Sequence, residues 1–182
     1  MEYIKKLHAH LIVSGLYQYP HPISKVITFY ALSPAHLTHA HPLFDQITQT
    51  NSFIWNIMVR GLSQSNKPQE AIFFYNRMRS QGIKQDNITF PFALKACSEV
   101  TAAREGKRMQ SHALKTGFVF DVFVSNALIH LYASFGELGS ASLVFNMLVR
   151  DLVSWNSLIC GYGQHNCLTE VLGLFEAMNA GP

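Results

Sequence analysis

Residues 53–61 read Phe-Ile-Trp-Asn-Ile-Met-Val-Arg-Gly, and residues 153–161 read Val-Ser-Trp-Asn-Ser-Leu-Ile-Cys-Gly. The two stretches share Trp-Asn at the third and fourth places and glycine at the ninth, so the chain repeats itself after 100 residues. The apolar residues that begin with the first tryptophan follow the spacing of one helix face, namely Trp55, Met58, Val59 and Leu62. This pattern predicts an amphipathic helix that recurs along the chain.

The 100 residues that start with the first copy divide into three shorter units, residues 52–86, 87–121 and 122–151. Each unit has two helical patterns. Glycine followed by an apolar residue marks several helix ends, at Gly15-Leu16, Gly82-Ile83 and Gly117-Phe118. One helix pair cannot bury its own apolar stripe, whereas stacked pairs can, so the sequence predicts an all-α solenoid. The large apolar residues predicted to pack inside it are Trp55, Phe74, Tyr75, Met78, Phe145, Trp155 and Phe175.

The composition is that of a folded protein, because 48% of the 182 residues are hydrophobic and 14% are charged. The formal net charge of +3 permits a polyanionic partner, although a protein that binds duplex DNA is usually more basic. No apolar run reaches the roughly 20 residues of a membrane span. The N-terminus, Met-Glu-Tyr-Ile-Lys-Lys, shows no signal or transit peptide. We therefore predict neither DNA nor a membrane as a partner.

The sequence shows no recognisable catalytic set. It lacks the H-x-E and C-x-x-C motifs of zinc deaminases, the G-x-S-x-G motif of hydrolases and a phosphate-binding G-x-x-x-x-G-K-[ST] loop. His36, His39 and His41 cluster, but Asp45 is the only carboxylate nearby, so a polar surface is predicted there and not a metal site. The cysteines are predicted to be reduced and mostly buried, at Cys97, Cys160 and Cys167. No enzyme activity, metal or cofactor is predicted.

Three segments resemble the plant pentatricopeptide-repeat (PPR) proteins of the PLS class: residues 53–61, Thr89–Cys97 (Thr-Phe-Pro-Phe-Ala-Leu-Lys-Ala-Cys) and Val124–Tyr132 (Val-Ser-Asn-Ala-Leu-Ile-His-Leu-Tyr). This class alternates P, L and S repeats of slightly different length, each a helix-turn-helix pair. The resemblance implies one PPR solenoid over residues 1–182, without the C-terminal E/DYW deaminase-like region. Its repeats would be 1–19 (partial L), 20–51 (S), 52–86 (P), 87–121 (L), 122–151 (S) and 152–182 (truncated P).

The resemblance implies that the chain binds single-stranded RNA with one base per repeat. In this family the fifth and last residues of a repeat read the base, and the second residue stacks against it. The base-reading residues would be Ser24, Asn51, Asn56, Asp86, Asn126, Asp151 and Asn156. The stacking residues would be Phe53, Ile88, Phe123 and Val153. His21 departs from the apolar pattern of the second position, and the fifth residue Pro91 has no group for hydrogen bonding to a base.

The family resemblance also implies base preferences. The pair Ser24/Asn51 would favour A, Asn56/Asp86 would favour U over C, and Asn126/Asp151 would favour a pyrimidine, with U first. Pro91/Asp121 would be indifferent, and a threonine paired with aspartate would favour G. The residues alone leave a second interpretation open, because Asn and Asp at these places are also the usual N-caps of helices.

The functional expectation is therefore recognition of a site in an organellar transcript, for C-to-U editing or RNA processing in a mitochondrion or chloroplast. Other editing factors would be further partners. The alternatives are a protein-interaction scaffold like that of tetratricopeptide repeats, or a non-functional fragment of a longer PPR protein. Since both ends fall inside repeats, apolar residues there are predicted to be exposed, namely Leu7, Leu11, Leu172 and Phe175.

Overall fold

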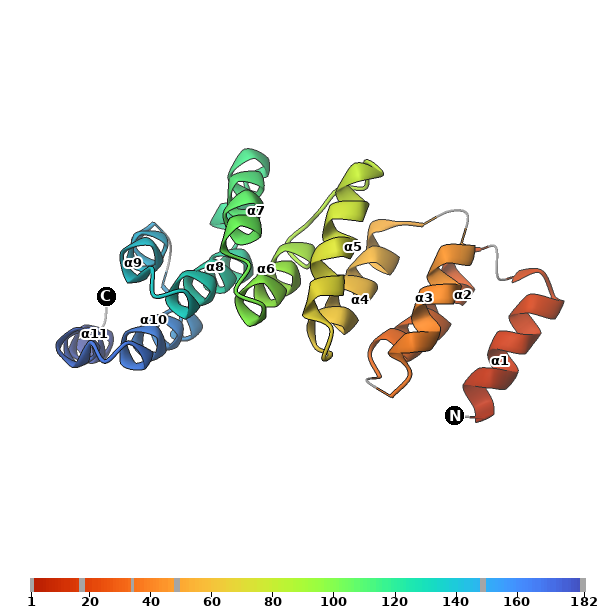
Figure 1. Ribbon diagram of the computed structural model, residues 1–182, viewed down its shortest axis with the longest axis horizontal. Coiled ribbons are helices and arrows are strands. Elements are labelled where there is room, and N and C mark those ends of the chain that lie inside the picture. The colour runs from red at the N-terminus through yellow and green to blue at the C-terminus, as the bar shows by residue number, and fades with distance from the viewer. Residues whose placement is uncertain (1, 17–18, 34, 48–49, 148–149, 181–182) are drawn as a thin grey trace. The chain divides into compact units, whose positions relative to one another are not determined.

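The computed structural model describes residues 2–16, 19–33, 35–47, 50–147 and 150–180, and all regular structure in these ranges is helical (Figure 1). The α-helices are α1 (Glu2–Val13), α2 (Pro20–Ala31), α3 (Leu37–Gln46), α4 (Ser52–Ser63), α5 (Pro68–Ser80), α6 (Thr89–Glu99), α7 (Ala103–Thr116), α8 (Val122–Ser134), α9 (Leu138–Asn146), α10 (Leu152–Gln164) and α11 (Leu168–Ala180). A 3-10 helix, η2 (Phe118–Phe120), follows α7. The all-helical prediction is confirmed.

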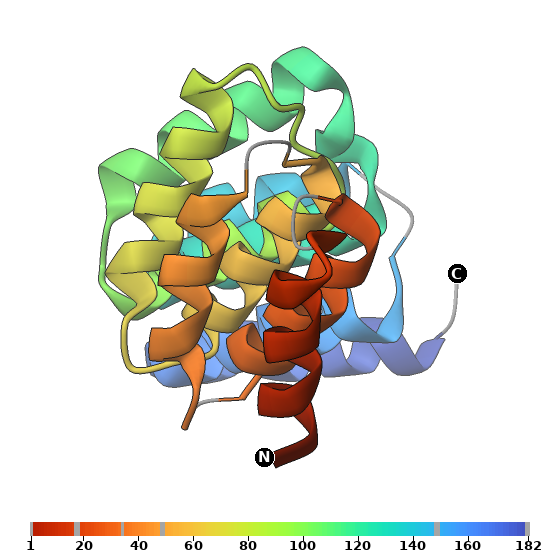
Figure 2. The ribbon, with the colours of Figure 1, turned by 90° about the vertical axis from the view of Figure 1, so that its right-hand side faces the viewer.

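The helices group into two compact units, Met1–Gln85 and Asp86–Pro182. In the first unit α2 packs on α1, α3 and α4, and α4 packs on α5. In the second unit α8 packs on α6, α9 and α10, while α6 packs on α7 and α10 packs on α11. Figure 2 shows the same helices from a second side. Within each unit the first helices of successive pairs therefore lie next to one another, as stacked helix pairs require.

The predicted glycine stops are confirmed. The backbone φ angle is 71° at Gly15, 73° at Gly82 and 80° at Gly117, all in the left-handed region. A side chain at such a position would bring its Cβ against the backbone, so glycine ends the helix at least cost. At the other end of a helix, Pro68 opens α5, where its missing N–H leaves no intrahelical hydrogen bond unmade.

Trp55 lies at the centre of the core of the first unit and is fully buried. The centroid of its ring is 4.5 Å from that of Phe44 and 5.8 Å from that of Phe74. Its indole N–H donates to the hydroxyl of Thr50 at 3.0 Å, so the polar atom of the buried ring has a partner. The guanidinium of Arg77 lies 5.5–5.8 Å from the centroids of all three rings.

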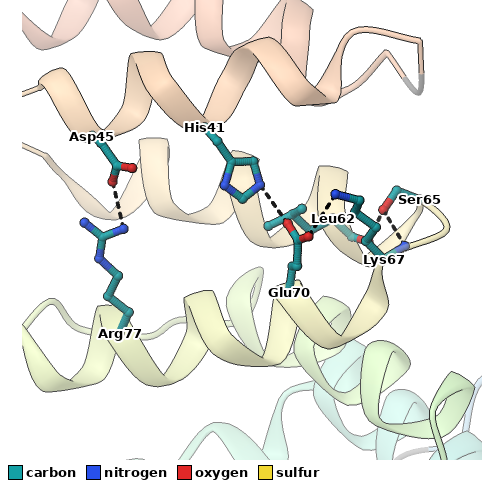
Figure 3. A network of polar contacts seen from close by, with 7 residues as sticks. All are labelled: His41, Asp45, Leu62, Ser65, Lys67, Glu70 and Arg77. Atoms are coloured by element: carbon teal, nitrogen blue, oxygen red, sulfur yellow. Dashed lines mark hydrogen bonds and ion pairs between the residues drawn. The ribbon is translucent and has the colours of Figure 1, made fainter.

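Ion pairs join the outer helices α3 and α5 of the first unit (Figure 3). Asp45 on α3 accepts from Arg77 on α5 at 2.8 Å, and His41 contacts Glu70 at 2.9 Å. Glu70 also pairs with Lys67, the residue just before α5, at 3.0 Å. These contacts lie at the surface, so they fix the register of the two helices more than they stabilise the fold.

Replacing Arg77 with alanine is expected to lower the free energy of unfolding of the first unit by about 1–2 kcal/mol, because the guanidinium covers three aromatic rings. Asp45→Ala removes the ion pair only, from a carboxylate that is 55% exposed, and should cost less than about 1 kcal/mol. Denaturant titration in a Trp155→Phe background, followed by the fluorescence of Trp55, measures both variants. Equal losses would show that Arg77 contributes through its ion pair and not through the rings.

The second unit confirms part of the predicted core. Phe145 is buried, and its ring centroid is 4.8 Å from that of Trp155, which is only partly buried. Phe175 on α11 is 52% exposed, so its predicted place in the core is wrong; α11 packs on α10, and Phe175 keeps the exposure expected of an end residue. Leu172 is likewise exposed, as predicted.

Two other predictions need correction. Leu11 is only 4% exposed, because α1 packs on α2 and covers it, although it was predicted to be exposed. The cysteines are free, as predicted, but only Cys97 is buried, while Cys160 is exposed and Cys167 is partly buried. Burial and the nearby carboxylate of Glu105 raise the pKa of the Cys97 thiol to about 12, so this thiol is inert.

Candidate nucleic-acid interface

The residues predicted to end the repeats bond to backbone N–H groups at the start of the next helix. Asn51, Asp121 and Asp151 are the N-caps of α4, α8 and α10, and Asp86 lies two residues before the N-cap of α6. Asn51 accepts from the N–H of Ile54 at 3.1 Å, and Asp86 accepts from the N–H of Thr89 at 2.9 Å. Asp121 accepts from the N–H groups of Phe123 and Val124 in α8, and Asp151 accepts from that of Ser154 in α10. The capping interpretation is thus correct. It is compatible with base reading, because a cap fixes the side chain and a carboxylate has further lone pairs to offer.

Asn126 and Asp151 form an amide–carboxylate pair between α8 and the start of α10. The Nδ2 atom of Asn126 lies 3.2 Å from both carboxylate oxygens of Asp151. The Oδ1 atom of Asp151 also accepts from the N–H of Ser154 at 2.7 Å, within a capping box. Two side chains that are 25 residues apart are therefore held together at one helix end.

The hydrogen bonds keep the Asp151 carboxylate ionised. Burial alone would raise the pKa of Asp151, but donors from the Ser154 backbone, the Asn126 amide and the Ser154 hydroxyl outweigh it and hold the pKa below its usual value. An ionised carboxylate only accepts hydrogen bonds. At neutral pH the pair thus offers a fixed acceptor beside an amide.

Asn126 and Asp151 line a hollow of about 370 Å³, and we call it the Asn126 hollow. Phe123 and Val153, the second residues of two successive predicted repeats, line it and are 65% and 55% exposed. The other lining residues are Pro91, Phe92, Lys95, Asn126, Ala127, His130, Asp151 and Ser157. Exposed apolar surface next to a polar edge is what a flat base requires for stacking and hydrogen bonding together.

The first unit contains a second hollow with the same plan, which we call the Ser24 hollow. It measures about 730 Å³, and its lining residues are His21, Ser24, Lys25, Thr28, Asn51 and Phe53. Ser24 and Asn51 are a predicted reading pair, and His21 and Phe53 are the second residues on either side. Although His21 departs from the apolar pattern, an imidazole ring is also a surface on which bases stack.

The other predicted residues line neither of these two hollows. Asn56 on α4 is only 5% exposed, and Asp86 belongs to the second unit, where it accepts from the N–H of Thr89 at the start of α6. Ile88 is 50% exposed at the start of α6, and Asn156 is exposed on α10. Asn56 and Asn156 are both fifth residues of predicted repeats, so the same position differs in exposure from one repeat to another.

Sequence reasoning missed three polar residues of the Asn126 hollow, Lys95, His130 and Ser157. Lys95 and His130 each follow a fifth residue by four places, Lys95 after Pro91 and His130 after Asn126, and residues four apart share a helix face. Counting four residues on from each fifth residue would have identified Lys95 and His130 from the sequence. Thr28 holds the same place in the Ser24 hollow.

The described residues were also compared with the requirements of a metal site and of a membrane span. No group of three or more His, Cys, Asp or Glu in this part of the chain is placed to hold a metal ion. None of the described helices is long and apolar enough to cross a bilayer. Of the clustered histidines, His36 and His39 lie beside the ring of Tyr30, and His41 pairs with Glu70.

Comparison with protein families agrees with the repeat pattern. The model of the PPR repeat family matches residues 50–99, and the PPR repeat model matches residues 123–151 and 153–180. The chain belongs to the pentatricopeptide repeat family. The matched ranges contain the Trp-Asn stretches and the amide–carboxylate pair of the second unit.

Similar PPR proteins come from plants. One pentatricopeptide repeat-containing protein of Arabidopsis thaliana is 34% identical over 182 residues, which cover 98% of this chain and 31% of the relative. Another from the same plant, named as chloroplastic, is 37% identical over 158 residues, or 85% of this chain and 30% of the relative. The chain thus spans about a third of the length of these relatives.

The PPR fold is shared with a solved structure. The crystal structure of the pentatricopeptide repeat protein PPR10 from maize aligns with 96% of this chain and 26% of its own, at 19% identity and a TM-score of 0.71. This confirms the predicted fold class, helix-turn-helix repeats stacked in an α-solenoid. PPR10 has also been solved in complex with an 18-nt psaJ RNA element, and that structure is 15% identical to this chain with a TM-score of 0.45.

Proposed function

We propose that this chain binds single-stranded RNA and reads one base at the Asn126 hollow and one at the Ser24 hollow. The observation that supports this most is the ionised Asp151 carboxylate, held against the Asn126 amide between the exposed side chains of Phe123 and Val153. Each part has a use in binding a base. The apolar surfaces stack on its faces, and the polar pair meets its edge.

A cation lies close enough to the same hollow to contact the RNA backbone. The ammonium of Lys95 lines the Asn126 hollow, and its nearest ion-pair partner, Glu99, is 3.6 Å away on the same helix. A single exposed pair at that distance is weak, so a phosphate can compete for the lysine. In the Ser24 hollow Lys25 takes the corresponding role.

The biological role we propose is site recognition in an organellar transcript. The chain's resemblance to PLS-class repeats and the relative named as chloroplastic support a mitochondrial or chloroplast RNA target, in C-to-U editing or in processing. In this proposal the chain recognises the RNA sequence at the site. A deaminase and other editing factors would contribute the chemistry.

Phe123→Ala is expected to weaken binding to single-stranded RNA about tenfold, because stacking on one aromatic side chain contributes roughly 1–3 kcal/mol per base. The RNA is the sequence that the full chain enriches from a randomised single-stranded pool, and fluorescence anisotropy measures the affinity. Phe120→Ala is the matched control. Phe120 is as exposed as Phe123, at 64% against 65%, but it lies on η2 and does not line the hollow.

The control should bind within about twofold of the unchanged protein. Equal losses in the two variants would show that the Asn126 hollow is not the stacking site. Failure to enrich any RNA, together with capture of peptides in a salt-independent manner, would replace RNA binding with the scaffold function.

A further inference from the structure

The repeat predicted to be indifferent to sequence contains an amide–carboxylate pair of its own. Its fifth residue is Pro91, which has no polar side-chain atom. However, the Nδ2 atom of Asn87, the first residue of that predicted repeat, donates to Oδ2 of Asp121 at 3.1 Å. The corresponding distance between Asn126 and Asp151 is 3.2 Å. The same two chemical groups therefore meet in both repeats, although the amide comes from a different position.

The cap leaves one oxygen of Asp121 for this contact. Its Oδ1 atom accepts from the N–H groups of Phe123 and Val124 at 2.9 and 3.3 Å. Its Oδ2 atom faces Asn87, whose side chain is exposed. The contact uses one of the two amide N–H bonds of Asn87, so its second N–H and its carbonyl oxygen are available to a ligand.

Exposed apolar residues lie close in sequence to both members of this pair. Ile88 directly follows Asn87 and is 50% exposed, while Phe123 follows the capping Asp121 by two residues and is 65% exposed. These are the second residues of two successive predicted repeats, the positions that stack on a base. In the following predicted repeats the first residues are Val122 and Leu152, which have no amide. Asn87 thus supplies the amide in the repeat whose fifth residue cannot.

We propose that Asn87 and Asp121 together read the edge of one base, so that this repeat is selective and not indifferent. Asp121 and the Asn87 carbonyl are acceptors, and the second N–H of Asn87 is a donor. The edge of every base presents a donor beside an acceptor, and their order differs between the keto bases, uracil and guanine, and the amino bases, cytosine and adenine. A fixed acceptor beside a fixed donor therefore distinguishes these two classes of base. This inference rests on the proposed RNA binding, and it replaces the expected indifference of this repeat.

Selection from a randomised RNA pool on the full chain tests the proposal. The unchanged protein should enrich one class of base, either U and G or C and A, about fivefold over the other at the base next to the one read by Asn126 and Asp151. Asn87→Ala should abolish that preference and leave the neighbouring base preference as it was. Asn87→Gln, which keeps the amide, should retain part of it. Asn76→Ala, at an exposed asparagine on α5, should change neither position.

Three outcomes separate the possibilities. If the unchanged protein shows no preference at this base, or if Asn87→Ala leaves the preference intact, Asn87 only supports the cap of α8 and the proposal is overturned. If no RNA is enriched at all, RNA binding itself fails. Thermal unfolding of each variant, measured alongside, shows whether a lost preference comes with a lost fold, and Asn87→Gln then decides the matter.

Discussion

Gly61→Ala is expected to lower the free energy of unfolding of the first unit by about 3 kcal/mol. A Cβ at this position would lie 2.1 Å from the carbonyl oxygen of Ala31 and 2.7 Å from its carbonyl carbon. These are backbone atoms at the end of α2, so α2 and α4 would have to move apart. Gly161, which recurs 100 residues later, makes a similar approach, with a Cβ position 2.4 Å from Cβ of Ala133.

Trp55 provides a local probe for this experiment. The chain has two tryptophans, so in a Trp155→Phe background the fluorescence comes from Trp55 alone, at the core of the first unit. The matched control is Gly173→Ala on α11, where an added Cβ meets nothing within 4 Å. Because alanine favours a helix over glycine, the control should gain about 0.5–1 kcal/mol, which circular dichroism measures. A loss of stability in both variants would show that the close approach of α2 and α4 is not what requires glycine.

Asn126→Thr, with Asp151 retained, is expected to change the preferred base at the Asn126 hollow from U to G, with an effect of about tenfold on the ratio of affinities. The reason is that PPR repeats with threonine and aspartate at these places favour G. The physical change is the replacement of an amide that both donates and accepts by a smaller hydroxyl beside the same ionised acceptor. Selection from a randomised RNA pool on both proteins measures the preference.

The dependence of RNA affinity on salt provides the control for Asn126→Thr. Since the proposed role of Asn126 is at a base edge and not at a phosphate, the slope of affinity against salt should stay the same. Asn76→Thr, at an exposed asparagine on an outer helix, should alter neither quantity. If U remains preferred in Asn126→Thr, the amide serves only to hold the cap of α10 in place, and base reading at this hollow is rejected.

The local pattern in the sequence determined the helices. Trp55 and Trp155 mark helices that begin at matching places, Ser52 and Leu152, and glycine after an apolar run placed the stops at Gly82 and Gly117. These features depend on a few neighbouring residues, because a helix face and a left-handed turn are both defined within one or two turns of chain. The family and the candidate reading positions followed from the same register.

Tertiary structure decided how exposed those positions are and which side chains they contact. Asn56, Asn126 and Asn156 share one register position, yet the first is 5% exposed, the second is partly buried and the third is exposed. Whether an asparagine reaches a carboxylate 25 or 34 residues away also depends on how successive helices pack. The sequence alone could place neither Asn126 beside Asp151 nor Asn87 beside Asp121, because exposure and reach are set by contacts between residues distant in the chain, which helical periodicity does not encode.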